Sequence, residues 1–285
     1  MELTRDNPLV SVIIPSFNSA DYIQAAISSV EYQDYPNREI IVIDDGSTDG
    51  TAEILRKSFP HLKTLRIPNS GVSAARNRGI IESKGELIAF LDSDDVWLQQ
   101  KLSRQIEVMK SRDADLVYCS GVEFDDSNSE IRFIKAQFHG RCYRDYRANP
   151  TTDITAVGPS GVLLKRNLIH KAGLFDCSVP APTEDWDFFR RCSMHGVFAF
   201  SAEVLVKKRI HKSNASRRSL ASYYQGNEVA VRKMFAEDRQ INYSERLVIR
   251  WKLLVNILKS GIKYRDIRMS AKMIICIIKI PIDAA

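Results

Sequence analysis

The chain has 285 residues, 44% of them hydrophobic and 27% charged, a composition that excludes disordered and fibrous classes and fits a globular protein. No apolar run reaches the roughly 18 to 20 residues that span a bilayer, and the first residues lack the apolar segment of a signal peptide. The five cysteines show no CxxC spacing, which argues against a zinc site or a disulfide framework. We therefore expect a cytoplasmic protein.

The net charge of +6 is unevenly distributed along the chain. Residues 207–285 hold 18 Lys and Arg against 6 Asp and Glu, whereas residues 1–206 hold 23 against 29. A basic tail on an acidic body favours an anionic partner, and residues 251–254 and 269–280 suggest basic amphipathic helices suited to an anionic membrane surface on the inner face of the cell membrane. Packing on the protein itself or on a second subunit of an oligomer is the alternative. No nucleic-acid-binding module is recognisable, so we expect no nucleic acid partner.

The first half of the chain alternates short apolar runs with amphipathic stretches, which is typical of βαβ units building a parallel sheet. Strands are predicted at residues 10–14, 39–43, 62–67, 87–91 and 114–118, and helices at 20–32, 51–57, 72–83 and 96–110. Residues 123–153 are polar and irregular, and such long loops are often functional. A second block is predicted to contain a strand at 161–164 and helices at 167–171 and after Thr183, and the chain looks helical beyond residue 217.

Polar side chains follow three of the predicted strands, at residues 16–18, 44–47 and 92–95. Parallel strands bring their carboxyl ends to one edge of a sheet, which is where open α/β sheets bind ligands. The three carboxylates of Asp92, Asp94 and Asp95 would repel one another unless a hard divalent cation neutralised them. The alternative is a polar turn in which Asp95 caps the following helix.

The crevice at this edge would suit a nucleotide diphosphate. The three-glycine dinucleotide fingerprint is missing after the first strand, and no lysine-bearing phosphate loop occurs in the chain. A bridging cation, rather than a glycine-rich loop, is therefore expected to hold the phosphates.

Five segments resemble family 2 glycosyltransferases of the GT-A fold, in that family's order: VSVIIPSFNSADYIQAAISSV, IIVIDDGSTDGT, NSGVSAARNRGI, GELIAFLDSDDVW and PTEDWDFF. The resemblance covers residues 9–212. It implies an α/β, GT-A nucleotide-diphospho-sugar transferase fold, with a mostly parallel central sheet flanked by helices and a helical C-terminal extension. We predict a catalytic domain at residues 1–215, with a nucleotide-binding half at 1–120 and an acceptor-side half at 121–215, followed by a basic helical region at 216–285.

The resemblance also implies an activity. An inverting, metal-dependent enzyme would move one hexosyl or N-acetylhexosaminyl unit from a nucleotide-sugar donor, a UDP-sugar, to a hydroxyl of a carbohydrate or lipid-linked acceptor in cell-surface polysaccharide or glycolipid assembly. The chain lacks the Q-x-x-R-W motif and the membrane spans of processive synthases, which favours transfer of a single sugar. A non-catalytic nucleotide-sugar-binding or membrane-docking module and a sugar nucleotidyltransferase are the alternatives.

Several residues receive nucleotide-binding roles from the resemblance. The segment along the base and ribose contains Pro15, Phe17 and Asn18; Asp45, with Asp44 beside it, matches an acid that binds uracil; Arg76 and Asn77 match positions near the nucleotide. A guanidinium suits a phosphate or a ring edge. Asp44 to Thr48 could also form a turn with a helix cap, and Arg76 could occupy a solvated helix face.

The remaining roles concern the metal and the proton. Asp94 matches the direct ligand of Mn²⁺ or Mg²⁺, while Asp92 would serve the ribose or a metal-bound water and Ser93 the nucleotide side. His211 matches a position that can reach the diphosphate or the metal, or it is a surface histidine in a basic run. Asp185, preceded by Glu184, matches the catalytic base that takes the acceptor proton. The alternative for this pair is a helix whose first turn is acidic because of the helix dipole.

Overall fold

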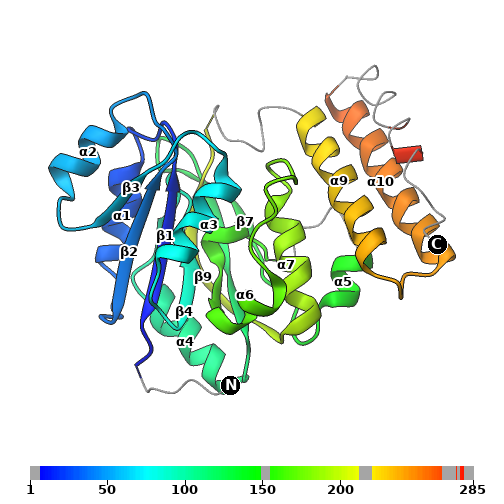
Figure 1. Ribbon diagram of the computed structural model, residues 1–285, viewed down its shortest axis with the longest axis horizontal. Helices are drawn as coiled ribbons and strands as arrows, with labels where there is room; N and C mark the ends of the chain where they lie inside the picture. Colours follow the sequence, from blue (N-terminus) through cyan, green and yellow to red (C-terminus); the bar gives the residue numbers. More distant parts are fainter. Residues whose placement is uncertain (1–6, 149–154, 212–219, 265–273, 275–276, 279–285) are drawn as a thin grey trace. The chain divides into compact units, whose positions relative to one another are not determined.

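The computed structural model describes residues 7–148, 155–211, 220–264, 274 and 277–278 (Figure 1). The chain divides into two compact units. Unit 1 comprises Met1–Cys142, Asp153–Phe175 and Arg191–His211, and unit 2 comprises Tyr143–Thr152, Asp176–Arg190 and Lys212–Ala285. The predicted domain division at residue 215 stays a prediction.

Unit 1 contains a nine-stranded sheet with the order β3-β2-β1-β4-β8-β6-β9-β5, and β7 pairs with β6. The strands are β1 (Val10–Ser16), β2 (Arg38–Asp44), β3 (Lys63–Arg66), β4 (Leu87–Phe90), β5 (Val96–Trp97), β6 (Leu116–Phe124), β7 (Glu130–Ile134), β8 (Leu163–Lys165) and β9 (Phe198–Arg209). Strands β3, β2, β1 and β4 run parallel, β8 is antiparallel to β4 and β6, and β6 is parallel to β9. The predicted α/β fold class is therefore confirmed.

Helices cover both faces of this sheet. Along β1, Val12 and Ile14 join the apolar core formed with α1 (Ile23–Glu31), α2 (Thr51–Ser58) and α4 (Lys101–Ser111). Ile13 points to the other face, where α3 (Val72–Glu82) approaches so closely that a Cβ at Gly79 would lie 2.3 Å from Ile13 Cγ2. Burial on both faces explains why the strand is a continuous apolar run rather than an alternating one.

The segment after β4 differs from its prediction. Val96 and Trp97 form the short strand β5, antiparallel to β9, and α4 begins only at Lys101. The Trp97 side chain is buried and donates its indole N–H to the carbonyl of Ser160 at 2.8 Å. This long-range contact outweighs the local helical pattern, so Asp95 is not a helix cap and that alternative is wrong.

The second half of the chain also contains more regular structure than its sequence predicted. The polar stretch 123–153 includes the end of β6, all of β7 and the helix α5 (Tyr143–Ala148). The predicted strand at 161–164 is confirmed in part. Residues 163 and 164 belong to β8, whereas Gly161 ends a 3₁₀ turn, η1 (Gly158–Gly161), and the short helix after the strand is α6 (Arg166–Ala172). Strand β8 pairs with strands distant in sequence, a partnership that local periodicity does not encode.

Unit 2 is helical where it is described. It contains α5, the first part of α7 (Glu184–His195), α9 (Leu220–Glu237) and α10 (Tyr243–Tyr264), which confirms the helical C-terminal extension. Two fully buried side chains of α7, Asp187 and Arg190, pair at 2.9 Å. Arg190 also contacts Glu237 at 2.6 Å, and Lys233 contacts Asp187 at 2.9 Å. These ion pairs join α7 to α9. In the described parts of the chain, no helix is both long and apolar enough to cross a membrane.

Candidate active site

The loops after β1 and β2 are tied to each other at the carboxyl edge of the sheet. The backbone N–H of Asn18 donates to Ser47 Oγ at 2.9 Å, and the Asn18 side-chain oxygen accepts from the N–H of Thr48 at 2.8 Å. Asp44 closes the second loop by accepting from the N–H of Ser47 at 3.0 Å. These bonds close the loop at 44–48, as the turn alternative expects, but the loop does not cap α2, whose N-cap is Gly50. Pro15 lies buried within β1, whereas Phe17 is 40% exposed and offers a ring face at this edge.

Asp45 is buried and organises the loop before α3. Its two carboxylate oxygens accept the backbone N–H groups of Ser70 and Gly71 at 2.8 and 2.9 Å. The neighbouring Gly46 has φ +75°, and a Cβ there would lie 2.9 Å from the backbone nitrogen of Asn69, so the close approach requires glycine. A carboxylate has about four lone-pair sites, so Asp45 retains capacity for a ligand donor.

Arg76 is a buried residue that contacts the acidic loop, residues 92–95, which follows β4. It is 3% exposed, which excludes the solvated-face alternative, and its guanidinium donates to Asp92 Oδ1 at 2.8 Å. The guanidinium carbon also lies 5.3 Å from the ring centre of Phe175. Asn77 holds the same phenylalanine, because its amide group bonds both the carbonyl and the N–H of Phe175 at 2.8 and 2.9 Å. The sequence pointed to Arg76 and Asn77 but missed Phe175.

Asp94 faces the end of β9. The imidazole Nε2 of His211 lies 2.9 Å from Asp94 Oδ2, and the His211 side chain is largely buried rather than at the surface. The ring of Tyr22 packs against His211 with 4.7 Å between ring centres. Burial, together with the Asp126 carboxylate, raises the pKa of Tyr22, which keeps its hydroxyl protonated. Asp94 thus meets His211, a residue 117 positions away that the family resemblance also assigned to the diphosphate or the metal, and the alternative of a surface histidine is wrong.

Asp95 and Ser160 hold the acidic loop in shape. Ser160 Oγ donates to Asp95 Oδ2 at 2.6 Å and accepts the N–H of Asp92 at 3.0 Å. Asp95 Oδ1 accepts the N–H of Arg209 at 2.9 Å. Burial, with the Asp94 carboxylate adding to it, raises the pKa of Asp95 well above its ordinary range. Ser93 ties the acidic loop to the segment after β1, since its hydroxyl lies 2.7 Å from that of Ser19. The sequence analysis missed Ser160, and its one signal there is a single polar side chain in a mostly apolar stretch.

Replacing Ser160 by Ala should loosen the acidic loop. The variant removes a partner of the buried Asp95 carboxylate and of the Asp92 N–H, and a lost buried partner costs about 1–3 kcal/mol. We expect a loss of that size in the unfolding free energy from urea titration. The exposed Ser111→Ala, whose hydroxyl only bonds a carbonyl of its own helix, is the control and should change stability by less than about 0.5 kcal/mol. Equal stability of the two variants would contradict this role.

The Asp94–His211 pair offers two side-chain donors for a divalent cation but not a complete coordination shell. The described residues contain no group of three or more His, Cys, Asp or Glu able to enclose a metal by themselves. Mg²⁺ and Mn²⁺ sites, however, commonly use one or two protein ligands and take the rest from substrate phosphates and water. The carboxylate of Asp94 and the imidazole of His211 are donors of suitable types and already face each other.

The predicted base lies in unit 2, whereas the predicted nucleotide and metal residues lie in unit 1. Asp185 is half-buried at the start of α7, and its carboxylate accepts the N–H of Trp186 at 2.7 Å. Glu184 is only 4% exposed, so Asp185 is the more accessible acid of the pair. Trp186 is buried beside Tyr146, with 6.2 Å between ring centres. The first turn of α7 is acidic, as the dipole alternative also expects.

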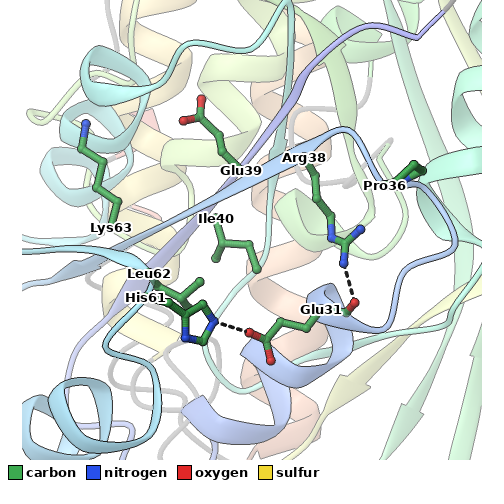
Figure 2. Close-up of a pocket in the computed structure, with 8 residues that line it drawn as sticks. All are labelled: Glu31, Pro36, Arg38, Glu39, Ile40, His61, Leu62 and Lys63. Carbon is green, nitrogen blue, oxygen red and sulfur yellow. Dashed lines mark hydrogen bonds and ion pairs between the residues drawn. The ribbon is translucent and has the colours of Figure 1, made fainter.

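A surface pocket of about 610 Å³ lies elsewhere on unit 1, where β2 and β3 begin. Figure 2 shows His61 pointing to Glu31, 2.7 Å apart, and Arg38 donating to the carbonyl of Glu31. Lys63 is paired with Glu82 at 2.7 Å. The pocket contains none of the predicted site residues and lies at the amino edge of the parallel strands, so the candidate site is the carboxyl edge.

Comparison with known proteins decides the family. Residues 11–173, more than half of the chain, match the family model described as "Glycosyl transferase family 2". The chain belongs to glycosyltransferase family 2. This glycosyltransferase is 34% identical over 224 residues to an uncharacterized glycosyltransferase of Rickettsia typhi, covering 77% of this chain and 70% of that protein.

A second relative has a more specific name. The Escherichia coli protein WfgD, a UDP-Glc:alpha-D-GlcNAc-diphosphoundecaprenol beta-1,3-glucosyltransferase, is 39% identical over 135 residues, covering 46% of this chain and 53% of that protein. The alignment with WfgD covers less than half of the glycosyltransferase described here. The resemblance is therefore stronger evidence for the family than for a particular sugar.

Solved structures support the GT-A fold. The S. aureus TarS structure in complex with UDP-GlcNAc superposes with a TM-score of 0.69 at 17% identity, covering 94% of this chain and 79% of that one. The mannosyltransferase PcManGT from Pyrobaculum calidifontis, in complex with GDP-Man and Mn²⁺, gives a TM-score of 0.59 at 18% identity over 96% of this chain and 87% of that one. At these identities the likeness concerns the fold.

Proposed function

We propose that this glycosyltransferase moves one hexosyl or N-acetylhexosaminyl unit from a nucleotide-diphosphate sugar to an acceptor hydroxyl, with inversion in one displacement. The observation that carries the proposal is a pair of contacts made by the acidic loop. Asp94 of this loop faces His211, and Asp92 of the same loop is held by the buried Arg76. These contacts support the proposal, because a carboxylate and an imidazole suited to a divalent cation, and a guanidinium, lie where β4 ends and would suit an anionic diphosphate.

The nucleotide would lie along the ends of β1 and β2. The exposed ring of Phe17 offers a stacking surface for a base, and Asp45 offers its spare lone pairs to a ring N–H. A UDP-sugar is the proposed donor because the WfgD relative is named for UDP-Glc and the TarS structure holds UDP-GlcNAc. PcManGT holds GDP-Man, so the choice of nucleotide is the first quantity to measure.

Asp94 and His211 would hold the cation, and Mn²⁺ is favoured because PcManGT holds it. When bound, a divalent cation offsets the negative charge on the departing diphosphate. Arg76 holds the Asp92 carboxylate through a hydrogen bond, and Ser160 holds the backbone N–H of Asp92. These side chains orient the donor before any bond changes, which is a large part of catalysis in group transfer.

Asp185 would act as the base. An acceptor hydroxyl that attacks the anomeric carbon must lose its proton, and a half-buried carboxylate can take it. Asp185 lies in the first turn of α7, where the helix dipole favours negative charge, as a base requires. The proposed acceptor is a lipid-linked sugar, as in the name of WfgD, within cell-surface polysaccharide or glycolipid assembly.

A calorimetric donor screen tests the proposal. Wild-type protein is titrated with UDP-Glc, UDP-GlcNAc and GDP-Man, each with Mn²⁺ and with EDTA. We expect one UDP-sugar to bind at least about tenfold more tightly with Mn²⁺ than with EDTA, a difference of about 1.4 kcal/mol. Equal affinity for the donor with Mn²⁺ and with EDTA would refute the metal site. Failure of all three nucleotide sugars to bind would refute the donor assignment.

A further inference from the structure

The helix α10 exposes an apolar stripe to solvent. Leu247, Val248, Trp251 and Leu258 are 41%, 53%, 67% and 48% exposed. Leu247, Trp251 and Leu258 recur at the four- and seven-residue spacing that places side chains on one side of a helix, and the half-buried Leu254 lies between them. We call Leu247, Val248, Trp251, Leu254 and Leu258 the α10 stripe.

The other side of α10 anchors the helix within unit 2. Ile249 and Leu253 are 3% and 0% exposed. Arg246 is buried, donates to the carbonyl of Phe235 on α9 at 3.0 Å and lies 5.1 Å from the Phe235 ring centre. Figure 1 shows α9 and α10 side by side. The α10 stripe is therefore not the surface that holds the helix to unit 2.

The C-terminal sequence that contains the stripe is basic. Helix α10 contains five Lys and Arg, of which Arg246 and Arg250 are buried, and a single acid, Glu245, whose carboxylate pairs with Arg147 on α5. Residues 239–285 contain ten Lys and Arg against three Asp and Glu. An apolar strip with an exposed tryptophan in a basic helix matches the helices that lie in the interface of an anionic bilayer.

We propose that the α10 stripe docks this protein on the surface of an anionic lipid bilayer. A second copy of the chain is a poorer occupant, because two helices of net positive charge repel each other. Docking is a property additional to sugar transfer and does not depend on it.

Trp251 provides a direct readout. The chain has three tryptophans, and Trp97 and Trp186 are 3% and 6% exposed, so only Trp251 is solvent-exposed. Full-length protein is mixed with vesicles of phosphatidylcholine containing phosphatidylglycerol, and with vesicles of phosphatidylcholine alone. We expect co-sedimentation and a blue shift of tryptophan emission with the anionic vesicles, both weakened by salt because exposed charges are screened.

The double variant Leu247→Gln/Trp251→Gln should reduce partitioning into anionic vesicles by roughly tenfold or more, since interfacial binding scales with buried apolar area. Its matched control is Ile131→Gln/Phe133→Gln on β7, where the side chains are 55% and 56% exposed. We expect the control to sediment like the wild type. All four replaced side chains are exposed, and melting curves check that both variants stay folded.

Two results would overturn the proposal. One is equal sedimentation of the wild type and the α10 double variant with anionic vesicles, including no binding by either. The other is a wild-type dimer in light scattering that dissociates in the α10 variant without any change in vesicle binding, which would make the stripe a subunit interface.

Discussion

Asp185→Asn is expected to lower kcat for sugar transfer by roughly 10³-fold, within the 10²- to 10⁴-fold range typical of a lost general base. The amide keeps the shape of the side chain but does not take a proton from the acceptor. Metal-dependent UDP binding should change by less than about twofold, because the proposed nucleotide and metal residues are others. Turnover and calorimetric affinity are measured on the same preparation.

A matched control for this variant is Asp145→Asn. Asp145 is also half-buried and also lies in the first turn of a helix of unit 2, α5, so it reproduces the loss of a first-turn acid without the proposed role. We expect near-normal transfer. If Asp185→Asn transferred sugar at a rate close to wild type, the base assignment would be wrong and the acidic turn of α7 would serve the helix alone.

Asp94→Ala is expected to weaken metal-dependent UDP binding on the order of 10²-fold, because the proposed cation site would lose its carboxylate and keep only the His211 imidazole. Binding measured with EDTA should be nearly the same for the variant and the wild type, which separates loss of the metal from general damage. Calorimetry with Mn²⁺ and with EDTA provides both numbers.

The control for Asp94 is Glu53→Gln on α2, whose exposed carboxylate pairs with Lys57 on the same helix. A surface pair of this kind contributes about 0–1 kcal/mol, so binding and stability should be almost unchanged. Identical Mn²⁺ dependence in Asp94→Ala and wild type would show that the cation, if it binds, is held elsewhere.

Much of the nucleotide-binding half could be predicted from the sequence. The apolar runs at Val10–Ser16 and Leu87–Phe90 are buried on both faces, and such runs are readable because the pattern is local. Once the strands are parallel, their polar ends share one edge, which places Asn18, Asp45 and Asp94 correctly at the carboxyl edge.

The errors have a common cause. The alternative in which Asp95 caps a helix is wrong, because Asp95 is held by Ser160 and by the N–H of Arg209, which are 65 and 114 residues away. Strand β8 enters the sheet antiparallel between β4 and β6, and the Val96–Trp97 strand forms only because β9 pairs with it. Such partners depend on the path of the whole chain, and burial then overrides local propensity.

The sequence by itself determined the fold class, the family and the edge of the sheet where the candidate site lies, because hydrophobic periodicity and motif order are written along the chain. Only the tertiary structure decided that Arg76 is buried against Asp92, that His211 faces Asp94 and that α10 turns Trp251 outward. The physical reason is that burial and pairing are properties of neighbours in space, and these neighbours are distant in sequence.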